Sequence, residues 1–85
     1  MGFLRRMAAF PQYRRSRDGR HAYRIEGPRA FTEVQVIGSR AVIHRVKDAA
    51  YPEQVRIREM IDGSEPYIAM DEREFQRMLD LHQRK

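Results

Sequence analysis

Arginine and tyrosine are the residues of this chain whose chemistry is most readily put to use. Fifteen of the seventeen basic residues are arginine, which binds phosphate in a bidentate geometry and stacks on nucleobases better than lysine does. Residues 1–24 contain seven arginines and one aspartate, a net charge of +6, whereas residues 25–85 carry a net charge of −1. The excess positive charge therefore lies in the amino-terminal segment and predicts a polyanion-binding surface.

Aromatic residues lie within or beside these basic positions. This pairing is typical of proteins that hold single-stranded nucleic acid, in which cations contact phosphates and rings stack on bases. For Tyr13 we favour a base-stacking role, whereas for Phe31 we favour a place in the core; Tyr23 and Tyr51 are the other aromatic candidates. The predicted nucleic-acid-binding residues are Arg5, Arg6, Tyr13, Arg14, Arg15, Arg17, Arg20, Arg24, Arg45 and Lys47.

The basic segment is also compatible with roles that involve no nucleic acid. A solubilising tail or an arginine-rich genome would produce the same composition. The rival function is a protein-interaction module or accessory regulatory subunit that docks on a larger partner through residues 3–10. A component of a ribonucleoprotein is a third hypothesis, and a homodimer is compatible with each. The sequence does not distinguish DNA from RNA.

Catalytic and metal chemistry have little support. The chain has no cysteine, and its three histidines are far apart in the sequence. No serine has histidine and aspartate neighbours in a nucleophile-like context, and no glycine-rich loop resembles a phosphate cradle. We interpret His44 and Glu33, which are predicted to face each other across two strands, as a structural pair. We therefore expect no enzymatic activity, no metal and no cofactor.

The length predicts one small domain with a shallow core. The longest apolar runs are far shorter than the ~20 residues of a membrane-spanning helix. The first ten residues also lack the unbroken apolar core of a secretory signal. We expect a cytoplasmic protein with no membrane partner.

Residues 31–47 predict the element around which the fold is arranged, a β-hairpin with Gly38-Ser39 as its two-residue turn. The turn sets the register, so that Ile37 faces Arg40 and Phe31 faces Val46. One face then carries a nearly apolar set, which we expect to be the core face. This set consists of Thr32, Val34, Val36, Ala41 and Ile43.

The chain before the hairpin divides into two parts. Residues 3–10 predict two turns of helix with Phe3, Met7 and Phe10 on one side, ended by Pro11. Residues 12–20 have no period and predict a loop with a turn at Asp18-Gly19. Residues 1–20 are thus predicted to be a basic arm, and residues 21–85 a single domain that opens with a strand at 21–26.

Residues 54–61 have two interpretations. As a strand they place Val55, Ile57 and Ile61 on one side and two arginines on the other. Pro52 and Gly63 instead suit the first position and the C′ position of a helix, but that helix has no clean apolar face. We favour the strand. Residues 66–70 predict a short extended piece after it.

The carboxy-terminal segment predicts an amphipathic helix. Asp71 is an acceptable N-cap, and Glu74 three residues later completes a capping-box-like pair. Phe75, Met78, Leu79 and His82 form one helix face that must pack on the sheet. The fold is therefore predicted to be α+β: an antiparallel sheet of three or four strands with this helix on one face. Its core would be Val34, Val36, Ile43, Val55 and Ile57 from the sheet.

A strand meander followed by residues 68–79 (Ile-Ala-Met-x4-Phe-x2-Met-Leu) resembles the positive-cofactor-four type of single-stranded DNA-binding domain. The resemblance covers residues 30–82 and implies nucleic acid on the sheet and dimerisation through the helix. Residues 63–66 (Gly-Ser-Glu-Pro) stand where that family has a basic, glycine-containing segment. No DNA-contact residue of the family is therefore transferred to this chain.

Overall fold

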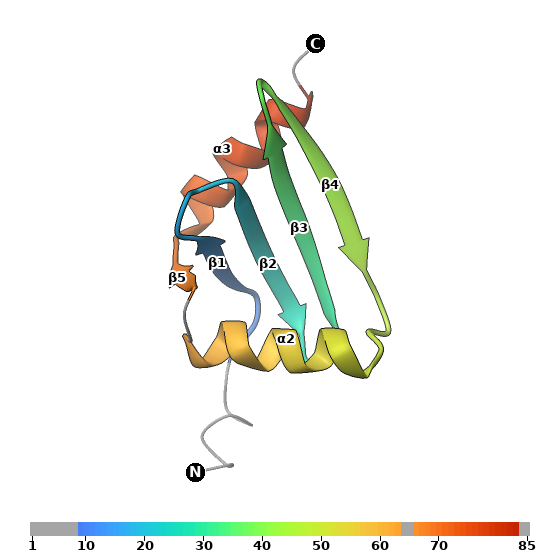
Figure 1. The fold of residues 1–85 in the computed structure, drawn as a ribbon. Coiled ribbons are helices and arrows are strands. Elements are labelled where there is room, and N and C mark those ends of the chain that lie inside the picture. Colours follow the sequence, from blue (N-terminus) through green and yellow to red (C-terminus); the bar gives the residue numbers. More distant parts are fainter. Residues whose placement is uncertain (1–8, 64–65, 84–85) are drawn as a thin grey trace.

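The computed structural model describes residues 9–63 and 66–83, which form one antiparallel sheet of five strands and two helices (Figure 1). The elements in chain order are β1 (Gln12–Ser16), β2 (His21–Gly27), β3 (Ala30–Ile37), β4 (Arg40–Val46), α2 (Tyr51–Asp62), β5 (Tyr67–Ala69) and α3 (Glu72–Gln83). The strand order is β4-β3-β2-β1-β5. The predicted α+β class is confirmed, although the sheet has more strands than expected and a second helix accompanies it.

The β3–β4 hairpin has the predicted register. Ile37 pairs with Arg40, Glu33 with His44, and Phe31 with Val46. Gly38 has a φ of 62° at the first central position of the turn, where a side chain would be strained. The turn chemistry therefore fixes which residues share each face of these two strands.

The loop predicted for residues 12–20 is wrong for residues 12–16, which form strand β1. This strand pairs with β2 on one side and with β5 on the other, so the sheet begins before the predicted boundary at residue 21. The expected turn does follow, with Gly19 at a φ of 75° and its N–H donating to the Ser16 carbonyl at 3.0 Å. Residues 1–8, which hold most of the predicted helix 3–10, lie outside the described residues.

The strand favoured for residues 54–61 is also wrong, because residues 51–62 form helix α2. Its terminal signals are those noted for the rival interpretation. Pro52 lies in the first turn, and Gly63 ends the helix in the left-handed region with a φ of 75°. Its N-cap residue, Ala50, makes no side-chain capping bond. Contacts with the sheet must therefore contribute much of its stability.

From residue 66 onward the structure agrees with the prediction. Strand β5 occupies the short extended piece, and helix α3 follows it. The Glu74 N–H donates to Asp71 Oδ1 at 2.9 Å, and the Asp71 N–H donates to Glu74 Oε1 at 3.4 Å, which is the predicted capping box. Phe75 is buried, and Met78 and Leu79 pack beside it. The side chain of His82 lies outside the described set.

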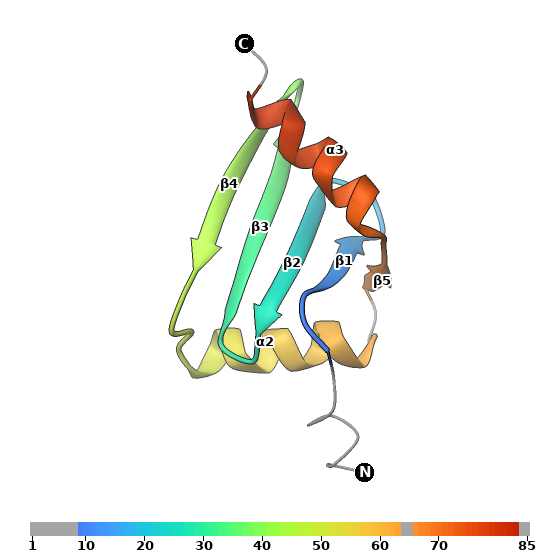
Figure 2. The same cartoon turned by 180° about the vertical axis from the view of Figure 1, so that it is seen from behind.

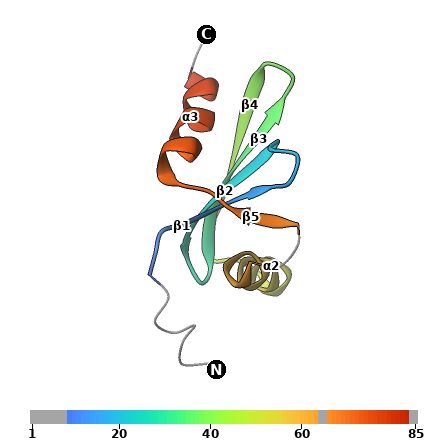
Figure 3. The same cartoon turned by 90° about the vertical axis from the view of Figure 1, so that its left-hand side faces the viewer.

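The two helices cover opposite faces of the sheet, which Figure 3 shows almost edge-on. On the α2 face, Ile57 and Met60 pack with Tyr23, Ile25 and Phe31. All five side chains are at most 3% exposed, so this face has a complete core of its own. The core position favoured for Phe31 is thereby confirmed.

On the α3 face, Phe75 packs on Ala22, Val34 and Ala41. The prediction of one core under one helix is therefore wrong in part. Ile57 belongs to helix α2 and lies on the opposite face from Val34 and Phe75. The sheet is sandwiched between two helices, and each covers only part of its face (Figures 1 and 2).

Candidate nucleic-acid interface

A row of side chains crosses the α3 face at the margin of helix α3. Tyr13 on β1 lies opposite Arg24 on β2, Arg24 opposite Thr32 on β3, and Thr32 opposite Arg45 on β4. Neighbouring strands are about 4.8 Å apart, so the row is compact. Figure 2 shows helix α3 crossing the end of the sheet near the β3–β4 turn and leaving the other end of β4 uncovered. We call these four residues the sheet row.

The middle of the sheet row is organised by a carboxylate. Glu26 Oε2 accepts a hydrogen bond from Arg24 Nε at 3.1 Å and another from Thr32 Oγ1 at 2.7 Å. Thr32 is only 1% exposed and lies at the floor of the row. The Arg24 guanidinium also lies over the Phe75 ring, 5.5 Å from its centroid. Arg24 is thus held in place, and Glu26 offsets part of its charge.

Tyr13 forms one end of the sheet row. Its ring is half-buried and lies 5.4 Å, centroid to centroid, from the ring of Phe75. An open hollow of about 310 Å³ adjoins it, and Phe10 and Pro11 form another wall of that hollow. Phe10 was assigned to a helix face by its spacing. Only the tertiary structure places its partly exposed ring beside Tyr13 and Arg24.

Arg45 and Lys47 supply the open positive charge at the other end. Both are exposed, and neither forms an ion pair within residues 9–63 and 66–83. Lys47 follows directly on β4. The sheet therefore brings together three residues predicted from the sequence, Tyr13, Arg24 and Arg45, with Lys47 at the end of the edge strand.

Arg14 points to the opposite face and is a structural residue. Its Nε donates to the Met60 carbonyl at 2.8 Å, and one Nη donates to the Ile61 carbonyl at 3.3 Å and to Gln12 Oε1 at 2.9 Å. These carbonyls belong to the last turn of α2, which has no basic residue of its own. Burial lowers the pKa of Arg14. We therefore remove Arg14 from the candidate nucleic-acid contacts.

The other predicted arginines do not join the sheet row. Arg15 shares the α3 face, where it donates to the Ser16 carbonyl at 3.2 Å and lies near Arg77. Arg17 and Arg20 are exposed in the β1–β2 turn. This turn joins the start of β2, whereas Glu26 lies near the other end of that strand. Arg5 and Arg6 lie outside the described residues.

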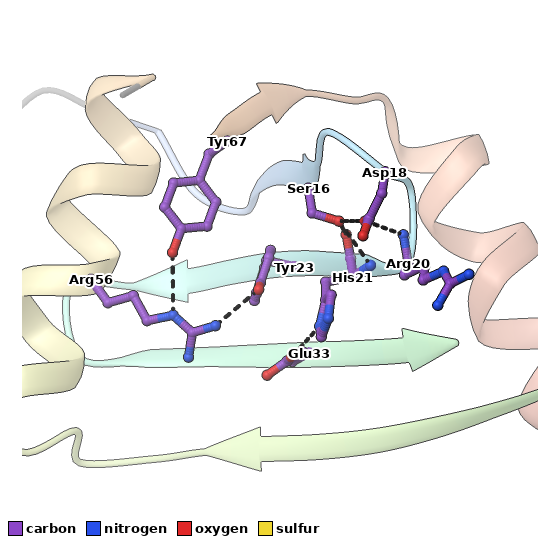
Figure 4. Close-up of polar contacts among 8 residues, drawn as sticks. All are labelled: Ser16, Asp18, Arg20, His21, Tyr23, Glu33, Arg56 and Tyr67. Carbon is purple, nitrogen blue, oxygen red and sulfur yellow. Dashed lines mark hydrogen bonds and ion pairs between the residues drawn. The ribbon is translucent and has the colours of Figure 1, made fainter. Parts of the chain in front are cut away.

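The β1–β2 turn holds a well-defined carboxylate. Asp18 accepts from the Ser16 hydroxyl at 2.6 Å and from the Arg20 N–H at 3.0 Å (Figure 4). These hydrogen bonds lower the pKa of Asp18. The turn is thus a closed local network that needs no ligand to explain it.

The α2 face holds a second polar group, the Arg56 cluster, which consists of Tyr23, Glu33, Arg56 and Tyr67 (Figure 4). Arg56 Nη2 donates to the Tyr23 hydroxyl at 2.9 Å, and Nε donates to the Tyr67 hydroxyl at 3.3 Å. The guanidinium also lies over the Tyr23 ring, 5.2 Å from its centroid. Burial lowers the pKa of Arg56, but the hydroxyl of Tyr67 and the nearby charges outweigh it, so the net shift is upward.

Sequence reasoning missed Arg56 because a strand at this position would have pointed it away from the core. The only available signal was the terminal pattern of a helix, Pro52 and Gly63, which would have placed positions 56, 57 and 60 on one side. Burial raises the pKa of Tyr23, with Arg56 opposing the effect. The Arg56 cluster is a structural link between helix and sheet.

The carboxylate of Glu33 pairs with a different histidine from the one expected. His44 lies opposite Glu33 in the register, but its side chain is exposed. His21 instead places Nδ1 2.7 Å from Glu33 Oε2. His21 lies diagonally across from Glu33 in the β2–β3 pairing. It pairs with the carboxylate because its ring stacks on Tyr23, with ring centroids 6.5 Å apart, and is held beside Glu33.

Among residues 9–63 and 66–83, no three histidine or acidic side chains gather as a metal site would require. No helix in that part of the chain is long and apolar enough to cross a bilayer. Comparisons with protein-family models, with curated proteins and with solved structures give no match. The arguments about function therefore rest on the geometry.

Proposed function

We propose that this protein is a non-enzymatic, cytoplasmic binder of single-stranded nucleic acid that uses the sheet row and Lys47. The observation that carries the proposal is the cross-strand alignment of Tyr13, Arg24 and Arg45 along the margin of helix α3, which leaves the end of β4 away from the β3–β4 turn uncovered. The predicted contacts Arg5 and Arg6 precede this surface in the sequence. A sheet-bound strand is also what the resemblance to the positive-cofactor-four type implies.

The division of labour follows from exposure. Arg45 and Lys47 neutralise phosphates, because both are exposed and neither is paired with a carboxylate among the described residues. Tyr13 and Phe10 border a hollow in which one base stacks, with Arg24 beside it. Guanidinium–phosphate contacts and stacking do not read base edges, so binding is weakly sequence-specific.

The test is a fluorescence anisotropy titration with short DNA and RNA oligonucleotides at several salt concentrations. The variant R45Q/K47Q removes two positive charges from the proposed interface. The control R73Q/R77Q removes two from exposed positions on α3. Because each phosphate contact contributes about 0.7 to the slope of log K against log salt, the first variant should lower the slope by about 1.4. Point variants are needed because deletion of residues 1–20 would remove strand β1.

The control variant should keep most of the affinity and the full salt slope. Equal losses in the two variants would show that net charge, not the sheet row, governs binding. Failure of the wild-type protein to bind any oligonucleotide at low salt would overturn the proposal in favour of the protein-interaction hypothesis.

A further inference from the structure

A cavity of about 520 Å³ opens between helix α2, the β2–β3 turn and the chain before β1. Its apolar wall consists of Phe10, Pro28, Ile57 and Ile61. Ile57 is fully buried, whereas the Phe10 side chain is 37% exposed. The volume falls in the range of small-molecule sites, roughly 300–1,000 Å³, and exceeds what a single packing defect would leave.

The polar side chains around this cavity favour an anion. Arg29 and Arg58 bring two positive charges, and Asp62 brings one negative charge. Arg58 is oriented by the ring of Tyr51, whose centroid is 5.9 Å from its guanidinium carbon. An apolar chamber with a net positive rim fits a flat or apolar group that carries a phosphate or carboxylate.

Phe10 connects this cavity to the proposed interface. Its side chain lines both the cavity beside α2 and the hollow beside Tyr13 and Arg24. A strand that lies along the sheet row on the α3 face reaches the cavity on the α2 face by passing around the chain at Phe10. Of the anionic ligands that the rim fits, a nucleotide is the one that this continuity selects.

We propose that the cavity receives one unstacked nucleobase, with its phosphate on Arg29 and Arg58. The base packs between the Phe10 ring and the half-buried Ile61 side chain of α2, with Ile57 beneath it, and Gln54 supplies a polar group for its edge. Gln54 is itself held by a hydrogen bond from Nε2 to the Ala49 carbonyl at 2.8 Å. This inference rests on the proposed function and adds to it a defined site for a single base.

The experiment titrates the full chain with uridine and adenosine 5′-monophosphate and follows the methyl signals of Ile57 and Ile61 by NMR. Ribose 5-phosphate is the probe that lacks a base. The monophosphates should shift both methyl signals with saturation, whereas ribose 5-phosphate should bind at least about tenfold more weakly, because base stacking is lost. Ile57 and Ile61 line the cavity and not the hollow beside Tyr13, so shifts of their methyl signals report the cavity and are independent of binding at the sheet row.

Two variants, F10A and R58Q, test the site, and L81A is the control. F10A should weaken monophosphate binding about tenfold. L81A, which truncates a side chain with the same 37% exposure on α3, should leave it unchanged. R58Q should weaken binding of the monophosphates while the folded spectrum is retained. Equal binding of ribose 5-phosphate, unchanged affinity in F10A, or the absence of shifts at Ile57 and Ile61 would each overturn the proposal, even if oligonucleotides bind through the sheet row.

Discussion

The two faces of the sheet use the same residue types for opposite purposes. On the α2 face, Arg56 is enclosed by the hydroxyls of Tyr23 and Tyr67 and fastens a helix to the sheet. On the α3 face, Arg45 is exposed at an edge strand and carries a charge that solvent or a polyanion must satisfy. The role of an arginine in this protein therefore depends on how many carbonyls, hydroxyls and rings surround it, and not on the local density of arginines.

The two helices differ in whether local or distant residues stabilise their ends. Helix α3 begins with its own capping box and acidic first turn, so local sequence defines it. Helix α2 has no side-chain N-cap, and its last carbonyls accept hydrogen bonds from Arg14 of strand β1. Of these two helices, the one that the sequence predicted, α3, is thus the one whose start needs fewer tertiary contacts to explain it.

The largest effect should come from testing whether each face has a core of its own. F31A and F75A each remove a ring that is 1% exposed, from the α2 face and the α3 face respectively. Each should cost about 3–5 kcal/mol, a large part of the ~5–15 kcal/mol typical of a native domain. Urea unfolding followed by circular dichroism measures both. A near-normal midpoint for either variant would mean that only the other face holds the fold together.

A smaller effect should separate the structural arginine from the exposed one. R56Q should lower the free energy of unfolding by about 1–3 kcal/mol, because two hydroxyls and an aromatic ring lose a charged partner. R45Q should change it by less than about 0.5 kcal/mol. Oligonucleotide affinity, measured where both variants are folded, should show the reverse order. The distinction between the faces fails if R56Q and R45Q have equal effects in either assay.

The smallest effect concerns alkaline pH. Burial raises the pKa of Tyr23 above its ordinary value of 10.0, so the folded state holds its proton more tightly than the unfolded state does. This contribution is fully present below about pH 10 and is lost as the pH rises through the raised pKa. Urea unfolding between pH 8 and 11 should therefore reveal a pH dependence in the wild type that Y23F lacks. Y51F, which alters a 70% exposed ring, should follow the wild type, and identical curves for all three proteins would contradict the account.

The fold could be predicted where local signals agree with one another. The Gly38-Ser39 turn and alternating side chains predicted the β3–β4 register, and Asp71 with Glu74 predicted the start of α3. Strand β1 was not predicted, because its two consecutive arginines obscure the alternation of apolar and polar residues that indicates a strand. Arg14 is half-buried, and its role as a structural residue depends on the carbonyls of α2 that lie beside it.

The candidate site was predictable only in its components. Tyr13, Arg24 and Arg45 were each marked by residue type, but they come from three strands whose order the sequence did not reveal. Phe10 and the cavity beside α2 were not foreseen, because residues 54–61 were interpreted as a strand. A helix at that position creates the wall formed by Ile57 and Ile61.

The sequence alone specifies the features that depend on neighbours along the chain. These are the hairpin turn, its register, the capping box of α3 and the excess of arginine near the amino terminus. Only the tertiary structure specifies the features that depend on residues close in space but distant in the sequence. These include which arginines are enclosed, which histidine meets Glu33, and which face each helix covers. The physical reason is that a turn or a cap satisfies its hydrogen bonds within a few residues. The environment of Arg14 or Arg56 exists only after distant strands and helices have packed.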